Sequence, residues 1–533
     1  MNTMRILGLV GFLIVITFSI KCKNHEKDVL HRNDKYVSIE GRQFIDSLGR
    51  TLTLHGISVI NKDPKTNYLG HISPEEFKMF KEWGFNVIRL GIIWDGLEPE
   101  PGVYNQEYLK GIDDMIQWAT DSGLYVFLDM HQDLYSVDFS DGAPSWATIT
   151  NNEPHLTGGV WSEAYLISPA VQTAFDNFWA NAPAPDGVGI QDHYLNLWKF
   201  LAERYKDNRK VIGFDVMNEP FMGSDANKVM PLLIESYAKI LAEELGEAPS
   251  SLEEVMHLWN NDKMKVLESL SDKETYKKWL DVIYEVNANF ESRTLTAFYQ
   301  RARDEIRKVN KNHIIFTEHS YFTNMGLVGA LGEIVDEQGK KDPLVAYAAH
   351  GYDLVVDTDA LTLGSNDRVE LIFERIAQTG QRLDVPVLIG EWGALHGQSP
   401  ELIPTANFLL NQFSKHGFSD AFWAYGKFLL DASFLDVLKK PYPVETSGSL
   451  ESYSFDYDTG VFSCTWQERE TITASTRIYV SDLSKLNKDA MQLNPNSKGV
   501  SIEKLEHSKA GHLVIPPSGK DAKRKLSFLL TKK

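Results

Sequence analysis

The chain has 533 residues, which is too long for one ordinary domain but suits a large domain with a smaller one attached. Its formal net charge of -19 argues against a nucleic-acid partner, because binding to phosphates requires a basic face. The two cysteines are Cys22 and Cys464. Because Cys22 lies in a leader-like segment, the folded part can form neither an internal disulfide nor a zinc site built on thiolates.

The first residues carry the pattern of an export signal. Residues 1–5 contain one basic side chain, residues 6–20 are almost entirely apolar, and the chain turns polar at Lys21. The apolar run is short for a membrane span, so we expect residues 1–22 to be a signal peptide or a lipoprotein signal. Cys22 stands where a bacterial lipoprotein carries its lipid, although Lys21 before it is unusual, and ordinary cleavage is the alternative. The prediction is a secreted or envelope-anchored protein, associated with a membrane through this lipid or through its substrate.

Between residues 35 and 438 one pattern recurs: an apolar, β-branched run, then a polar residue and a loop, then a stretch with helical periodicity. The runs cover residues 51–59, 86–94, 124–133, 211–220, 313–319, 344–353, 385–393 and 420–426, with helices expected for example over 74–83 and 105–121. Strands that alternate with helices pair in parallel, and eight such units close into a barrel. The predicted fold class is therefore α/β, with a (β/α)8 TIM barrel over residues 35–438.

Two connections, residues 134–192 and 221–290, are far too long for ordinary barrel loops. Both follow strands at the carboxyl-terminal rim, where enzymes with this fold build their sites. Their large apolar side chains include Trp161, Met230, Leu232, Leu233 and Trp259. We expect these loops to shape the substrate site with an apolar groove, and the alternative is that they only extend the rim.

Residues 440–533 have a different character. Short runs of alternating polarity are separated by turn residues such as Gly460 and the segment 494–499, and no long helical pattern is present. This spacing predicts a C-terminal antiparallel β-sandwich. It is either a binding module or a structural domain that packs on the barrel.

Two glutamates stand at the ends of apolar strands, Glu219 at the fourth and Glu391 at the seventh. All strands of a barrel end at one mouth, so these two carboxyl groups can converge although they are far apart in sequence. Glycoside hydrolysis requires such a pair, because one carboxyl group protonates the leaving oxygen while the other attacks the anomeric carbon or activates water. A single glutamate after a strand is usually a cap or a surface charge. A pair beside other polar groups predicts a sugar-cleaving site.

Other strand ends bring further polar or aromatic side chains to the same mouth. Arg89 lies inside an apolar strand, where a buried guanidinium needs an anionic partner, and Glu391 is the natural candidate. The remaining side chains are His131, Asp133, Asn218, His350, Tyr352 and Trp423. Each of them alone could be structural, but together they place functional groups on most of the strands.

Asn218-Glu219-Pro220 on the fourth strand and Glu391-Trp392-Gly393 on the seventh resemble the motifs of glycoside hydrolase family five, a retaining family. The family pattern is complete here, with Arg89, His131, Asn218, Glu219, His350, Tyr352, Glu391 and Trp423. A narrower resemblance, to the endoglycoceramidase branch, rests on DMHQDLYS from Asp129, AFDNFWAN from Ala174, FDVMNEPFMG from Phe214 and SFDYDTGVF from Ser454. These motifs span most of the chain, including the sandwich.

The resemblance implies a role for each of these residues. Glu391 would form the glycosyl-enzyme, while Glu219, with a raised pKa, would protonate the leaving oxygen and then deprotonate water. Arg89 and Tyr352 would hold Glu391, and His350 would orient Glu219. The sugar-contacting residues would be Lys62, His131, Asp133, Asn218 and Trp423, with Trp423 stacking under the sugar. No metal or organic cofactor is implied.

The predicted function is a retaining endo-β-glycosidase that separates the glycan of a glycosphingolipid from its ceramide, acting as a monomer on a glycolipid substrate. One alternative is a glucosylceramidase or steryl-β-glucosidase, since the same branch contains both. Another is a cellulase-like endoglucanase or a mannanase with an open cleft. The alternative from a different class is a non-catalytic carbohydrate-binding surface protein, which would be favoured if either glutamate were missing.

Overall fold

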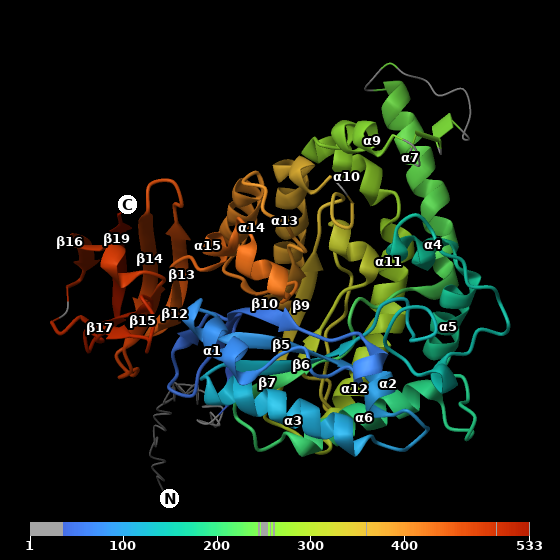
Figure 1. Cartoon of the computed structure of the whole chain (residues 1–533), viewed down its shortest axis with the longest axis horizontal. Coiled ribbons are helices and arrows are strands. Elements are labelled where there is room, and N and C mark those ends of the chain that lie inside the picture. The colour runs from blue at the N-terminus through green and yellow to red at the C-terminus, as the bar shows by residue number, and fades with distance from the viewer. Residues whose placement is uncertain are drawn as a thin grey trace, which may run out of the picture.

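The computed structural model describes residues 36–243, 246, 254–255, 257–258, 262–358, 360–496 and 498–531. The predicted export signal with Cys22, and also Trp259, lie outside these residues. Figure 1 shows a large body of strands and helices with a β-rich unit, coloured red, at one end of the long axis. Among the described residues, no helix is both long enough and apolar enough to cross a membrane.

Eight parallel strands form a closed barrel in the order β10-β11-β4-β5-β6-β7-β8-β9. Their bounds are β4 His55–Val59, β5 Val87–Ile93, β6 Tyr125–His131, β7 Val211–Asp215, β8 Ile314–Thr317, β9 Val345–Gly351, β10 Val387–Trp392 and β11 Ser419–Phe422. Each predicted run contains all or most of one strand, so the predicted barrel is confirmed. Every strand residue except the first of β6 is buried, which explains why the runs are apolar throughout.

Helices surround the barrel, and two of them begin at caps that are visible in the sequence. The amide of Ser73 donates to the carboxylate of Glu76 at 2.9 Å ahead of α1, and Asn105 caps α3 by accepting from two backbone amides. The outer helices are α1 Pro74–Glu82, α3 Gln106–Asp121, α6 Ile190–Arg204, α12 Thr296–Arg307, α13 Asn366–Leu383 and α14 Leu402–His416, with the short α2 Trp94–Leu97 and α15 Leu435–Leu438.

The two long connections fold into helices at the end of the molecule opposite the β-rich unit (Figure 1). The first contains α4 Ala164–Ile167 and α5 Pro169–Trp179, and the second contains α7 Val229–Glu243, α9 Lys263–Ser269, α10 Lys273–Asp281 and α11 Tyr284–Asn289. Met230, Leu232 and Leu233 pack into the apolar core of this region. Leu233 is buried in this core, while Met230 and Leu232 are partly buried against it, so much of their apolar surface holds the helices of the insertion together. A groove lined by these side chains stays a prediction.

The β-rich unit consists of two sheets that share one apolar core. One has four strands in the order β13 Gly448–Phe455, β14 Val461–Glu468, β19 Ala522–Leu530 and β16 Leu486–Asn494. The other has seven, in the order β1 Ser38–Glu40, β2 Gln43–Ile45, β3 Thr51–Leu52, β12 Tyr442–Thr446, β15 Thr476–Val480, β18 Gly511–Ile515 and β17 Ser501–Lys504.

The first three strands of the chain thus belong to the same sheet as the C-terminal strands, whereas the sequence pattern placed them with the barrel alone. β3 pairs with β12, with Thr51 opposite Thr446 and Leu52 opposite Glu445. Phe44 and Leu52 also pack against side chains at the amino-terminal end of the barrel, including Phe127. These strands therefore cover the floor of the barrel and extend the sandwich.

Candidate active site

A cleft of about 360 Å³ opens at the carboxyl-terminal ends of the barrel strands. Seven of the residues predicted at the barrel mouth line it, namely Lys62, His131, Asp133, Glu219, Tyr352, Glu391 and Trp423. Strands that are distant in sequence therefore bring these side chains to one place, as the barrel predicts.

Glu219 and Glu391 face each other across this cleft. One carboxylate oxygen of each and a ring nitrogen of His350 all lie within 4.8 Å of one another. Glu391 lies on β10, while Glu219 follows β7 by four residues and has a φ of +42°. This left-handed backbone is unusual for a residue with a side chain, and such strain occurs where surrounding contacts hold a functional group in place. Here the amide of Glu219 donates to Glu318 at 2.8 Å.

Two donors hold the carboxylate of Glu391. Nη1 of Arg89 donates to Oε1 at 2.6 Å, and the hydroxyl of Tyr352 donates to Oε2 at 2.9 Å. Arg89 is fully buried, and Glu391 is 4% exposed. Both oxygens are therefore aimed by fixed donors, one on each oxygen.

The guanidinium of Arg89 lies among further acidic groups beneath the cleft. Its Nε donates to Asp215 at 3.0 Å, and its Nη2 donates to Glu318 at 2.8 Å and lies 3.1 Å from Asp129. Burial and the neighbouring Glu318 raise the pKa of Asp215 well above its ordinary value, while Arg89 opposes this rise. This cluster keeps Arg89 in one orientation, with Nη1 pointing at Glu391.

Glu219 has a different environment. Nδ1 of His350 lies 3.0 Å from its Oε1, and the amide Nδ2 of Asn324 donates to the same oxygen at 2.7 Å. Burial raises the pKa of Glu219 to about 7, with the nearby Glu391 acting in the same direction and His350 opposing it. Although burial disfavours its charge, Glu318, Glu391 and Glu219 raise the pKa of His350 well above its usual value. Glu219 can therefore both hold and release a proton near neutral pH.

A second group of polar side chains lies on the Trp423 side of the cleft. The ring of His131 stacks on Trp423, with centroids 5.0 Å apart and planes at 13°, and Nζ of Lys62 lies 5.0 Å from the Trp423 ring. Lys62 bonds to Asp133 and lies 3.5 Å from Asp141. Burial opposes ionisation of Asp133, but Lys62 and His131 lower its pKa to about 2. This side of the cleft offers charged hydrogen-bonding groups beside an aromatic face, which is an arrangement suited to sugar hydroxyls.

The two glutamates divide the rim of the barrel into two arcs. Glu219 follows β7 and Glu391 lies on β10, so β11, β4, β5 and β6 form one arc between them while β8 and β9 form the other. The longer arc carries the polar residues Lys62, His131, Asp133 and Trp423. The shorter arc, β8 and β9 with the loops after them, contributes Met325, Leu354 and Val356 to the cleft. One side of the carboxyl pair is therefore polar, and the other is partly apolar.

Of the predicted rim residues, Trp161 from the first insertion does line the cleft. It is 43% exposed, and its Nε1 donates to Asp357 at 3.1 Å. Asn218, Arg89 and His350 lie beneath the cleft and do not line it. Because the Asn218 amide is engaged by Arg89 and by the carbonyl of Gln132, its contact with a sugar hydroxyl stays a prediction.

Sequence reasoning missed several groups. Asp129, Asp215 and Glu318 are acidic residues in or directly after apolar strands, and the signal that pointed to Arg89 could have found them. Asn324 and Asp141 lie in loops, where no pattern marks them. Two acidic clusters of the site already contain a basic side chain in the position that a metal ion would take. Lys62 pairs with the cluster of Asp133 and Asp141, and Arg89 pairs with the cluster around Asp215.

The arrangement can carry out double displacement at an acetal carbon. Carboxyl oxygens within 4.8 Å of one another are closer than the carboxyl groups of enzymes that invert anomeric configuration, and this separation is typical of enzymes that retain it. The held carboxylate of Glu391 suits a nucleophile, and the raised pKa of Glu219 suits a proton donor.

Family models match both parts of the chain. The model described as cellulase (glycosyl hydrolase family 5) matches residues 49–248 and 258–428, and the glycoside hydrolase family 5 C-terminal domain matches residues 440–515. Together these matches include the barrel, the carboxyl pair and most of the sandwich.

Similar proteins and solved structures include several that are named endoglycoceramidase. An endoglycoceramidase of Cyanea nozakii is 34% identical over 216 residues, which cover 35% of this chain and 42% of that protein. Endoglycoceramidase I of Rhodococcus hoagii is 24% identical over 469 residues, or 85% of this chain and 82% of that protein. The solved complex of endo-glycoceramidase II from Rhodococcus sp. with a cellobiose-like imidazole has a TM-score of 0.69 at 25% identity, covering 92% of this chain and 99% of that one. The chain thus spans less than half of the Cyanea relative but nearly all of the solved structure.

Proposed function

Because this chain belongs to glycosyl hydrolase family 5, we propose that it is a retaining endo-β-glycosidase that cleaves between the glycan and the ceramide of glycosphingolipids. The observation that carries the proposal is the carboxyl pair of Glu219 and Glu391, with oxygens less than 4.8 Å apart in a cleft that has one polar and one partly apolar side. That separation is typical of glycosidases that retain anomeric configuration.

In the first step Glu391 attacks the anomeric carbon while Glu219 gives its proton to the leaving oxygen. Arg89 and Tyr352 keep the attacking oxygens aimed, so no reorientation is needed at the moment of reaction. The glycan becomes esterified to Glu391, and the aglycone leaves with the proton of Glu219.

In the second step Glu219 takes a proton from water, which attacks the ester and releases the glycan. The negative charge of Glu391 is one cause of the raised pKa of Glu219. Esterification removes this charge, so the pKa of Glu219 falls and the residue changes from acid to base. His350 and Asn324 hold its carboxylate through both steps.

The two arcs of the rim support a substrate that is sugar at one end and lipid at the other. Lys62, His131 and Asp133 would bond the hydroxyl groups of the glycan, with Trp423 beneath the sugar at the cleavage point. Met325, Leu354 and Val356 would contact the first part of the ceramide, where each methylene removed from water contributes about 0.8 kcal/mol. The relatives named endoglycoceramidase favour the same substrate class.

The place of action is part of the proposal. The apolar run over residues 6–20 and the cysteine at position 22 support export, with lipid attached at Cys22.

The test compares rates on lactosylceramide, glucosylceramide and cellotetraose under matched detergent, with the products identified by mass spectrometry. We expect lactosylceramide to be cleaved fastest, into intact lactose and ceramide. Faster turnover of cellotetraose than of either lipid would overturn the substrate assignment. A preference for glucosylceramide would assign the chain to the activity of its relatives named glucosylceramidase.

A further inference from the structure

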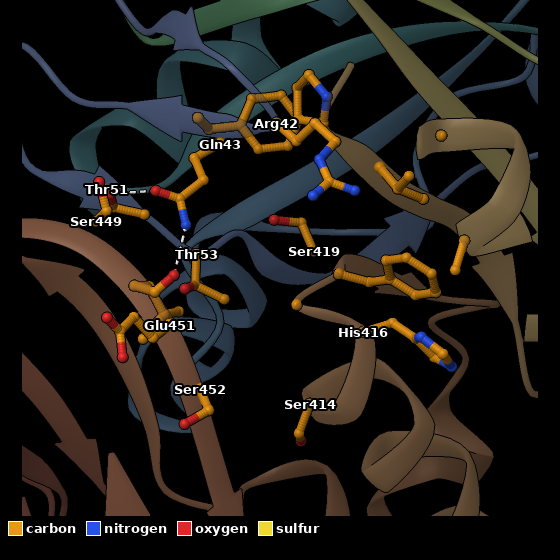
Figure 2. Close-up of a pocket in the computed structure, with 18 of the residues that line it drawn as sticks. Arg42, Gln43, Thr51, Thr53, Ser414, His416, Ser419, Ser449, Glu451 and Ser452 are labelled. Carbon is orange, nitrogen blue, oxygen red and sulfur yellow. Dashed lines mark hydrogen bonds between the residues drawn. The ribbon is translucent and has the colours of Figure 1, made fainter. Parts of the chain in front are cut away.

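A second and larger cavity, of about 580 Å³, lies at the opposite end of the barrel from the carboxyl pair. Three parts of the chain line it: the strands β2 and β3, the carboxyl-terminal ends of α13 and α14 with the amino-terminal ends of β10 and β11 that follow them, and strand β13 of the sandwich (Figure 2). Its volume is within the range of small-molecule sites, which is roughly 300–1,000 Å³. Its walls are rich in hydroxyl groups, which come from both the barrel side and the sandwich side.

Hydrogen bonds fix the walls on both sides. The amide of Gln43 donates to the carbonyl of Leu450 at 2.6 Å and accepts from the hydroxyl of Thr51 at 3.1 Å, as the dashed lines in Figure 2 show. On the opposite wall the hydroxyl of Ser419 accepts from the amide of Leu54 at 3.0 Å. The cavity is therefore part of the folded architecture, with N-terminal and C-terminal strands bonded across its edge.

Several polar groups on these walls lack partners. Figure 2 shows the guanidinium of Arg42 directed into the space near Ser419, and among the described residues it has no hydrogen bond or ion pair. The hydroxyl groups of Thr53 and Ser452 likewise have no partner within the described part of the chain; Thr53 is 7% exposed, whereas Arg42 and Ser452 are exposed to solvent at the cavity. These groups are therefore free to bond a ligand that enters the cavity in place of water.

The other charged groups around the cavity are neutralised. Glu40 pairs with Arg469 at 2.5 Å, Glu451 pairs with Lys523 at 2.5 Å, and Lys415 pairs with Glu370 at 2.9 Å. Burial, together with Lys415, lowers the pKa of His416, whose ring stacks on Phe418 and is neutral at neutral pH. Arg42 is thus the one unpaired charge among the described residues that line this cavity.

We propose that this cavity binds an acidic oligosaccharide, whose carboxylate pairs with Arg42 and whose hydroxyl groups bond Thr53, Ser452 and the polar groups around them. A guanidinium matches a single carboxylate through two parallel hydrogen bonds. The hydroxyl-rich walls match a polyol, and they offer little to a lipid chain.

The ligand of this cavity is a different glycan from the one being cleaved. Ser419 lines the cavity, while Trp423, four residues further along, lines the catalytic cleft. At about 3.3 Å per residue, the two sites are roughly 13 Å apart along this segment, with the packed barrel between them. Occupancy of the cavity would therefore hold the enzyme on a surface rich in acidic glycans and leave the catalytic cleft open.

The test is calorimetric titration of the full chain carrying Glu391→Gln, with 3′-sialyllactose as the probe. Arg42→Ala and Ser452→Trp are added separately, the first to remove the charge and the second to fill the cavity. Arg209→Ala is the matched control, because Arg209 is an exposed arginine remote from the cavity lining. Thermal unfolding of each variant shows that it is folded.

We expect a binding event that persists when saturating lactose occupies the catalytic cleft; both cavity variants should weaken this event at least tenfold, and Arg209→Ala should leave it unchanged. Lactose should not compete for this event, and Arg42→Ala in the otherwise native chain should hydrolyse a soluble aryl lactoside at the normal rate. An identical titration curve for Arg42→Ala and its parent would overturn the proposal. So would equal competition by lactose, or displacement by acetate at the concentration of the sialyllactose, since the latter would mean a simple anion site.

Discussion

Asn324 offers a direct test of how the proton donor is tuned. Its amide donates to Oε1 of Glu219 at 2.7 Å, and this bond stabilises the ionised form of Glu219. Asn324→Ala removes the donor, so the carboxylate becomes less stable and the pKa of Glu219 rises. A hydrogen bond to a charged group contributes about 1.5–3 kcal/mol, which corresponds to a rise of about 1–2 pKa units.

The assay is the pH dependence of kcat/KM on an alkyl lactoside, whose poor leaving group needs the proton of Glu219. Activity requires protonated Glu219, so it should fall above a pH of about 7 in the parent enzyme and only above about 8–9 in Asn324→Ala. The leaving group of a dinitrophenyl lactoside needs no proton, so with this substrate kcat/KM should show no such fall at alkaline pH in either protein.

Tyr321→Phe is the matched control, because Tyr321 lines the same cleft but makes no hydrogen bond to Glu219. In this variant kcat/KM should fall above the same pH as in the parent enzyme. The reasoning is refuted if kcat/KM of Asn324→Ala still falls near pH 7. It is also refuted if the fall shifts to higher pH by the same amount in Tyr321→Phe.

Three further predictions concern the carboxyl pair and the N-terminus. Glu391→Ala should lose turnover by several orders of magnitude and recover it with azide as an α-glycosyl azide; an α product from the Glu219 variant alone would mean that the two roles are reversed. Glu219→Ala should keep much of its activity on substrates with good leaving groups and lose it on alkyl glycosides, and equal losses on both would argue against its role as acid. Mass spectrometry of the mature protein should find Cys22 as a lipid-bearing first residue, whereas a retained Met1 would exclude export.

Much of the barrel could be predicted because its strands are buried on both faces. Burial leaves a continuous apolar run, and the run stops at the residue that enters the site, which is how Glu219 and Glu391 could be found. The same logic extended to Arg89, since a charge within such a run needs a partner. Asn324 and Asp141 could not be found this way, because they lie in loops where side-chain placement depends on tertiary contacts.

Two other features depended on packing that no local pattern records. Met230 and Leu233 have the polarity expected of a groove, but the helices of the insertion need the same side chains for their own core. The strands β1 to β3 are too short to reveal a partner, and β3 has only two residues. Its pairing with β12 joins segments almost 400 residues apart, and periodicity says nothing about such pairings.

That pairing makes the two ends of the chain mutually dependent. Removing everything after residue 439 would leave β3 paired with β2 alone and expose the edge that now pairs with β12. Exposed strand edges recruit other chains, so a truncated barrel would tend to aggregate. The sandwich therefore cannot be exchanged between relatives by replacing the C-terminal residues alone. A chimera must also replace residues 36–53, so it needs two junctions in the chain.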